Sequence, residues 1–272
     1  GTGFSIFENI KYLDPTLILW RSSSQWIGGL YFLVFLLIIF SNKSFNFKMT
    51  SLTYTGESNI VSEENIKNNF IKIFIFYSTL SILIFFLLSV SGIRLFNSLN
   101  LSMSLISGGG FLPSNNLNNI INSNFKKIIL IACLVISLLN FFLLFNIFNK
   151  KSLTKDHKED FYLIILSLIL ILLVFFNNFD GLDLIIAVLS SLANSGITLL
   201  ETNNNLSLYF LFITIIGGSL ISNTSGIKMS RFYILLKITS SEIIKLISPN
   251  NVINKTIFNN EKKITDDHIR IS

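Results

Sequence analysis

Residues Arg94–Phe111 of this 272-residue chain read RLFNSLNLSMSLISGGGF, a short, half-apolar stretch that ends in three glycines. The stretch is too short to cross a bilayer, because a transmembrane helix needs roughly 20 mostly apolar residues. It lies between two longer apolar runs, Ile71–Val90 and Ile128–Phe148. A short helix and a glycine turn between two spans is the layout of a re-entrant pore loop, whose non-helical backbone is tolerated because it lines a water- or ion-filled cavity.

The same order of segments occurs a second time, where the short stretch Leu182–Ala193 is followed by Asn194–Thr198. A third copy is implied at the start of the chain, where Gly1–Phe4 precede a further apolar run. Repetition of one unit in a fixed order is typical of a repeat architecture. We therefore expect an all-α integral membrane protein with repeated helix–pore-loop–helix units around a pore. The expected spans are Leu17–Phe40, Ile71–Val90, Ile128–Phe148, Phe161–Phe176 and Leu206–Ile221.

The composition argues against a soluble protein. Hydrophobic residues make up 51% of the chain and charged residues only 13%, whereas soluble domains carry about 25% charge. The net charge of +6 is explained by basic loops on the cytoplasmic side, so no nucleic-acid partner is expected. If the glycine turns face outside, most of the 21 Lys and Arg residues fall on the inner side. We expect a multi-pass protein in the lipid bilayer of the cell (inner) membrane, with its pore loops facing outside.

The residues offer no catalytic or metal centre. Cys133 is the only cysteine, and His157 and His268 are isolated in polar segments without the paired spacing that a metal requires. The expected spans contain scattered Ser, Thr and Asn but no nucleophile–base pair. They also contain no buried carboxylate of the kind that marks a proton relay. We therefore expect neither an enzyme nor a cofactor-binding chain.

The glycine turns have the chemistry of an ion filter. A dehydrated cation needs oxygen ligands, and backbone carbonyls supply them without a net charge that would trap the ion. Aiming successive carbonyls inward requires dihedral angles that favour glycine, although a tight turn explains each glycine taken alone. The expected ligands of K+ are the filter carbonyls of Gly1, Thr2, Gly3, Ser107, Gly108, Gly109, Gly110, Ala193, Asn194, Ser195 and Gly196.

A few carboxylates lie near the expected outer mouth of the pore. They can concentrate cations at the entrance by focusing the electric field. The alternative, that they are ordinary solvated loop carboxylates, stays equally open at this point. These residues are Asp14, Asp180, Asp183 and Glu201.

The last expected span is interrupted by glycines and polar residues between Gly217 and Gly226. A broken helix below a filter is a candidate gate, because its freed backbone groups must be satisfied by the pore or by water. The alternative is that the span ends near Ile221 and a cytoplasmic loop follows. Lys228 and Arg231 either latch the gating segment or anchor a helix end at the inner surface. The expected gating residues are Gly217, Gly218, Asn223, Thr224, Ser225, Gly226, Lys228 and Arg231.

Three stretches carry a family resemblance. Trp20–Gly29 (WRSSSQWIGG) resembles the W-R-x-x-x-Q-W-x-G-G signature that follows the first pore loop of Trk-type potassium transporters. Leu105–Phe111 (LISGGGF) resembles their second filter, and Gly217–Arg231 resembles the glycine-rich gating segment of their third repeat. The chain thus resembles a TrkH-like membrane subunit of the Trk/Ktr/HKT superfamily, from the first filter through the third repeat.

The resemblance implies four pore-loop units around one pore, of which the fourth filter and the first outer helix are missing from this chain. It also implies a homodimer in the membrane and a cytosolic nucleotide-binding regulatory subunit of the RCK/TrkA type. The implied units are the end of the first repeat (1–48), the second pore-loop repeat (49–150), the third with an interrupted last helix (151–248) and a cytoplasmic segment leading to a fourth (249–272).

The chain departs from the family pattern at each loop. The third filter reads ANSG over Ala193–Gly196 where the family usually has T-T-A-G, and Leu112–Pro113 replace S-T after the second filter. Thr224–Gly226 replace a triple glycine in the gating segment. The expected function is transmembrane transport of potassium or another monovalent cation, and the preference for potassium over sodium rests on the family alone. The alternatives are a secondary carrier with a midplane site and a non-conducting structural membrane subunit.

Overall fold

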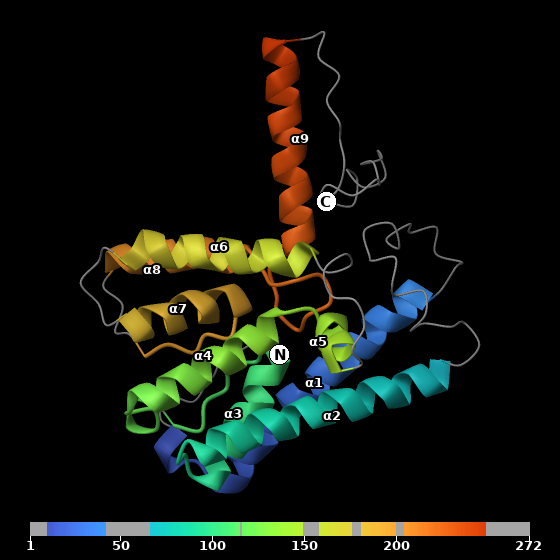
Figure 1. The fold of residues 1–272 in the computed structure, drawn as a ribbon. Coiled ribbons are helices and arrows are strands. Elements are labelled where there is room, and N and C mark those ends of the chain that lie inside the picture. Colours follow the sequence, from blue (N-terminus) through green and yellow to red (C-terminus); the bar gives the residue numbers. More distant parts are fainter. Residues whose placement is uncertain are drawn as a thin grey trace.

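The computed structural model describes residues 10–41, 66–114, 116–148, 158–175, 181–199 and 204–248. Within these ranges the chain is built of helices joined by turns and loops (Figure 1). The predicted all-α fold class is therefore confirmed. The helices are η1 (Ile10–Tyr12), α1 (Pro15–Ser41), α2 (Ile66–Val90), α3 (Leu95–Ser107), η4 (Leu117–Asn119), α4 (Asn124–Leu138), α5 (Phe141–Phe148), α6 (Lys158–Phe175), α7 (Gly181–Ala193), α8 (Asn204–Ile215) and α9 (Met229–Ile247).

The order of the helices follows the expected repeat. A long helix, a short helix, a turn and another helix occur as α2, α3 and α4, and again as α6, α7 and α8. The short α3 packs against α1 and α2, and the short α7 packs against α4, α6 and α8. Leu101 and Leu105 of α3 and Ile186 of α7 are fully buried, so both short helices form the core between the longer ones. The first turn, Gly1–Phe4, lies outside the described residues, and the boundaries of the units stay predictions.

Large apolar side chains are exposed on the outer faces of the long helices. Leu172 of α6 is 63% exposed and Phe212 of α8 is 66% exposed. Among the described residues, the segment Phe70–Val90 is long and apolar enough to cross a membrane, and Gly181–Ala193 and Leu206–Ile215 are shorter apolar helices. A surface of exposed apolar side chains over a packed core suits lipid as the surrounding solvent.

The span expected over Ile128–Phe148 is wrong in one respect, because the helix is divided at Leu139 into α4 and α5. Leu139 is extended, with a ψ of 158°. The Asn140 N–H donates to Asp160 Oδ1 at 2.9 Å, and the next backbone N–H donates to the Ile221 carbonyl at 2.8 Å. Acceptors from distant segments therefore replace the lost helical hydrogen bonds, and the local apolar pattern carries no sign of them.

The span expected over Leu206–Ile221 is shorter than predicted, since α8 ends at Ile215. The loop that follows does not trail away from the core. Ile216 and Ile227 form a parallel bridge, and Leu220 is only 6% exposed. The interruption is therefore a folded loop inside the helical core, followed by α9.

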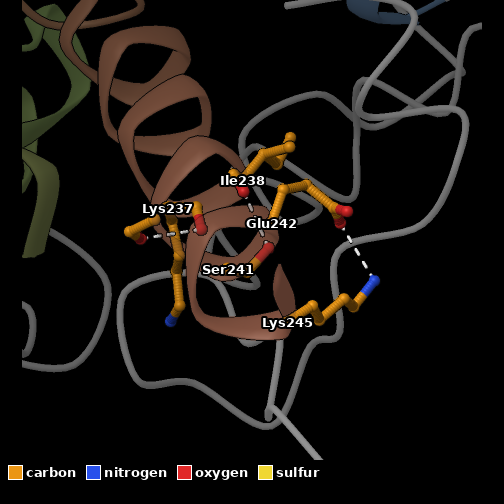
Figure 2. Close-up of polar contacts among 6 residues, drawn as sticks. Lys237, Ile238, Ser241, Glu242 and Lys245 are labelled. Atoms are coloured by element: carbon orange, nitrogen blue, oxygen red, sulfur yellow. Dashed lines mark hydrogen bonds and ion pairs between the residues drawn. The ribbon is translucent and has the colours of Figure 1, made fainter. Parts of the chain in front are cut away.

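Helix α9 projects away from the other helices (Figure 1). Its base is buried at Met229 and Ile234, whereas its far half carries exposed polar pairs. Figure 2 shows one of them, the Glu242–Lys245 ion pair at 2.9 Å, in which about half of each side chain is exposed. Exposed pairs of this kind contribute little to stability, so α9 is held to the fold at its base. The predicted cytoplasmic segment 249–272 lies outside the described residues.

A partly buried ion pair joins the two units. Lys127 in the first turn of α4 lies 2.6 Å from Asp183 in the first turn of α7, and their side chains are 15% and 13% exposed. The negative charge of Asp183 is favourable at the N-terminus of α7, where the helix dipole is positive. The positive charge of Lys127 is unfavourable at the N-terminus of α4 for the same reason. The pair therefore compensates a local electrostatic cost while it docks α4 against α7.

We expect Lys127→Met to lower the free energy of unfolding by roughly 1–3 kcal/mol, because it leaves a mostly buried carboxylate without its partner. Thermal unfolding in detergent micelles measures the change. Lys245→Met, which removes an exposed pair, is the matched control and should cost less than about 0.5 kcal/mol. Equal losses in the two variants would contradict a docking role for Lys127.

Candidate pore loops and gating loop

The two short helices end in the same turn. At the end of α3 the N–H groups of Gly108 and Gly109 donate to the carbonyls three and five residues earlier, at 3.2 and 3.0 Å. At the end of α7 those of Asn194 and Ser195 do the same, both at 3.1 Å. The first residue of each turn is left-handed, with φ values of 63° and 53°. This is the Schellman arrangement, and Asn is one of the few residues besides Gly that tolerates its left-handed position.

A second left-handed residue follows each turn. Gly110 has a φ of 77° and Gly196 a φ of 64°. In both loops a residue with positive φ alternates with one of ordinary φ, so successive peptide groups point in different directions. Residues with a Cβ atom adopt a positive φ less readily than glycine. The predicted second and third filters therefore share one backbone form, although their sequences differ. Gly1, Thr2 and Gly3 of the predicted first filter lie outside the described residues.

A glutamine of α1 holds the second loop. Gln25 Nε2 donates to the Gly109 carbonyl at 2.7 Å, and Gln25 Oε1 accepts from the Phe111 N–H at 3.2 Å. A Cβ atom built on Gly109 would lie 2.3 Å from Gln25 Cδ, so the loop must be glycine here to lie against the amide. The buried Gln25 thus fixes two backbone groups of the predicted filter, and one of its carbonyls is already engaged.

Two other residues of the WRSSSQWIGG block contact the second loop and helix α2. The guanidinium of the buried Arg21 lies 4.3 Å from the centroid of the Phe111 ring, in cation–π geometry. Trp26 Nε1 donates to Ser81 Oγ of α2 at 2.7 Å. The stretch Arg21–Trp26 of α1 therefore contacts both the predicted second filter and helix α2.

The second loop, the third loop and the interrupted helix meet at one place. A Cβ atom built on Gly108 would lie 3.1 Å from the Asn223 carbonyl oxygen and 3.7 Å from the Ala193 carbonyl oxygen. The third loop is held nearby, because Asn194 Nδ2 donates to the Thr214 carbonyl at 3.1 Å. Main-chain oxygens of the third loop and of the interrupted helix therefore both lie beside Gly108 of the second loop.

The predicted gating loop, Gly217–Gly226, is closed at its base by backbone hydrogen bonds. The Gly217 N–H donates to the Ile227 carbonyl, and the Ile227 N–H donates to the Ile215 carbonyl, both at 2.8 Å. The two segments at the base of the loop lie so close together that a Cβ atom on Gly217 would overlap the Ser225 carbonyl. Gly226 has a φ of 83°. Two of the predicted gating glycines are therefore required by the geometry of the loop.

Lys228 binds the loop from inside. Its Nζ donates to the Ser222 carbonyl at 3.0 Å and to the Thr224 carbonyl. Thr224 Oγ1 in turn accepts from the Gly218 N–H at 2.9 Å. Arg231 lies further along α9, and its Nε makes no hydrogen bond within the described part of the chain. Of the two cations considered from the sequence, Lys228 is the one that contacts the loop.

Two buried carboxylates at the start of α6 were missed by the sequence analysis. Glu159 Oε1 accepts from the Leu220 N–H at 2.9 Å and from the Ser230 N–H at 3.0 Å, so it joins the loop to the base of α9. Its neighbour Asp160 braces the break between α4 and α5. Glu159 is 2% exposed and Asp160 1%. Their position just before the expected span was the available signal, since buried acids in a membrane protein mark functional positions.

Of the carboxylates expected at the outer mouth, Asp183 has a side-chain contact and Asp14 is exposed. Asp183 pairs with Lys127. The Asp14 carbonyl accepts the first N–H groups of α1, those of Leu17 and Ile18. Asp180 and Glu201 lie outside the described residues.

We expect Glu159→Ala to lower the free energy of unfolding by roughly 2–5 kcal/mol, because two buried N–H groups lose their acceptor and each costs about 1–3 kcal/mol. Denaturant titration in micelles measures the change. Glu159→Gln keeps an acceptor oxygen and should lose clearly less, and Glu242→Ala on exposed α9 should lose almost nothing. A Glu159→Ala variant as stable as the native chain would exclude the bracing role.

The chain is similar to two known proteins. No family model matches the chain. The chain is 28% identical over 259 residues to an uncharacterized cation transporter of Methanocaldococcus jannaschii. The aligned region covers 93% of this chain and 53% of that protein. The crystal structure of the potassium transporter TrkH from Vibrio parahaemolyticus superposes with a TM-score of 0.76 at 21% identity, over 91% of this chain and 54% of TrkH. The chain therefore spans about half the length of these two proteins.

Both similar proteins are transporters, which agrees with the prediction that the chain is not an enzyme. The fold match extends over nearly all of the chain. The resemblance seen in the sequence is thus confirmed at the level of the fold, since the chain shares the fold of TrkH over 91% of its length.

Proposed function

We propose that this chain forms part of the pore of a monovalent-cation transporter, with potassium as the transported ion. The observation that carries the proposal is the meeting of three main-chain segments, at Gly108, Ala193 and Asn223, around one point. Two of these segments are glycine turns of identical form at the ends of buried short helices. The similarity to a cation transporter and the fold of TrkH support the same function.

The proposed chemistry is exchange of ligands by a dehydrated cation. Main-chain carbonyls of the filter replace the water molecules of the ion and add no net charge, so the ion can both enter and leave. The loop between α8 and α9, held by Lys228 and Glu159, lies against the second filter and obstructs this path until it moves. Potassium as cargo is taken from the name of the structural neighbour, and the altered residues of the third loop leave main-chain ligands available.

The surroundings of the pore belong to the same proposal. The pore loops face outside and the basic segments face the cytoplasm of the cell (inner) membrane, in agreement with the positive-inside rule. Two copies pair in the bilayer, and a cytosolic nucleotide-binding ring of the RCK/TrkA type acts on the gating loop. These partners extend the proposal to the whole protein. The chain itself spans about half the length of each of the two similar proteins.

The interrupted helix also favours a second candidate, a secondary carrier with a site at the break between α8 and α9. Loop groups such as Ser219 and Ser222 are buried and would line such a site. The paired glycine turns at the ends of α3 and α7 have no role in a carrier of this kind, and for this reason we prefer the pore.

We expect the protein in its full natural length, reconstituted in liposomes, to take up rubidium, and we expect added potassium to block that uptake because both ions compete for the same carbonyl ligands. Isotope uptake driven by an internal potassium gradient measures the transport. Exchange that requires an organic solute would favour the carrier, and the absence of any cation flux would favour a structural subunit.

We expect Gly110→Val to abolish selective flux while the protein still inserts, because a β-branched residue resists the φ of 77° and turns the carbonyl away. Uptake of rubidium against sodium measures selectivity. Gly92→Val is the matched control, since Gly92 has a φ of 85° and open space around it, outside the predicted filters. It should lose stability and keep selectivity. Unchanged selectivity in Gly110→Val would remove the case for a filter at this turn.

A further inference from the structure

One side chain at the tip of the gating loop bonds directly to the base of the second filter. Asn223 Nδ2 donates to the Ile106 carbonyl at 2.9 Å. Ile106 lies in the last turn of α3, whose final carbonyls have no partner within the helix. The residue that follows it, Ser107, begins the predicted filter. The Asn223 amide therefore satisfies a carbonyl of the pore helix and ties the loop to it.

The fold leaves space for this amide at one glycine of α1. A Cβ atom on Gly29 would lie 3.1 Å from Asn223 Nδ2, 3.0 Å from Ser107 Cβ and 2.7 Å from the Tyr77 hydroxyl. Its neighbour Gly28 would meet nothing within 4 Å. The two glycines of the WRSSSQWIGG block thus differ, and only the second one is needed for the contact between loop and filter.

The tip of the loop also borders a small cavity. Leu33, Tyr77, Phe141, Ser222 and Asn223 are among its lining residues. Asn223 Oδ1 is buried and has no hydrogen-bond partner within the described part of the chain. The amide nitrogen therefore contacts the pore helix, while the amide oxygen makes no hydrogen bond among the described residues.

We propose that Asn223 is a positioning residue that holds the gating loop closed against the second filter, and that Gly29 provides the space for it. The loop opens when the amide leaves the Ile106 carbonyl. This inference rests on the proposed pore function and names its regulation. Gln25 holds the filter through other atoms, so release of Asn223 changes the rate of transport without changing the choice of ion.

The first test measures rubidium uptake by the full-length protein with Asn223→Ala and Asn223→Leu, the second of which keeps the bulk of the side chain without its donor. One hydrogen bond shifts a two-state equilibrium by roughly 2- to 12-fold. We expect uptake to rise by about that factor, with an unchanged ratio of rubidium to sodium uptake. Gly29→Ala should act in the same direction, since its methyl group displaces the amide.

Two control variants match these changes. Gly28→Ala alters the adjacent glycine of the same helix, where there is open space. Asn118→Ala removes an amide that also donates to a backbone carbonyl, that of Leu199 at 3.3 Å, in a contact that does not involve the loop. Both controls should transport at the native rate.

A second measurement does not depend on transport. Ser222 is 2% exposed, so a Ser222→Cys variant, in a background without other cysteines, should react slowly with a water-soluble maleimide. Adding Asn223→Ala should raise the labelling rate by roughly 2- to 12-fold, because the opened loop exposes the thiol. Adding Asn118→Ala should not change the rate.

The two measurements separate the possible failures. Absence of flux in the native protein would refute the proposed function, and the labelling rates would still decide whether Asn223 holds the loop. An unchanged labelling rate in the Asn223 variants would overturn the inference whatever the flux. A changed ratio of rubidium to sodium uptake would also overturn it, because Asn223 would then act on the filter itself.

Discussion

Backbone N–H and C=O groups that lose their helical partners in an apolar environment must form other hydrogen bonds. The arrangement of the structure around its broken helices depends on this requirement. The chain breaks its helices between α4 and α5 and between α8 and α9. The two breaks help to satisfy each other, because the Phe141 N–H donates to the Ile221 carbonyl and the Ser219 N–H donates to the Leu138 carbonyl. An irregular loop can therefore exist within the helical core.

Two long polar side chains provide further hydrogen-bond partners for the backbone of the loop. Glu159 accepts two N–H groups at the two ends of the loop, and Lys228 donates to carbonyls between them. The loop is thus braced from α6 and α9.

The predicted filter is braced from a different direction. Gln25 of α1 fixes the Gly109 carbonyl and the Phe111 N–H, and the hydrogen bond from Asn223 to the Ile106 carbonyl adds a direct link between loop and filter. Apart from this link, the loop and the predicted filter are held by different side chains. The replacement of glycine by Asn194 in the third loop fits the same logic, because the turn needs a left-handed residue and Asn can supply one.

The sequence by itself determined the helical class, the two short helices and the positions of the glycine turns, because hydrophobic length and glycine placement are local properties. It also located the interrupted helix and the block around Gln25. The division of the predicted third span, the roles of Glu159 and Asp160, and the contact of Asn223 with Ile106 were decided only by the tertiary structure. Each of these is a hydrogen bond between groups at least 20 positions apart, and a local pattern cannot show which distant partner satisfies an unpaired backbone group.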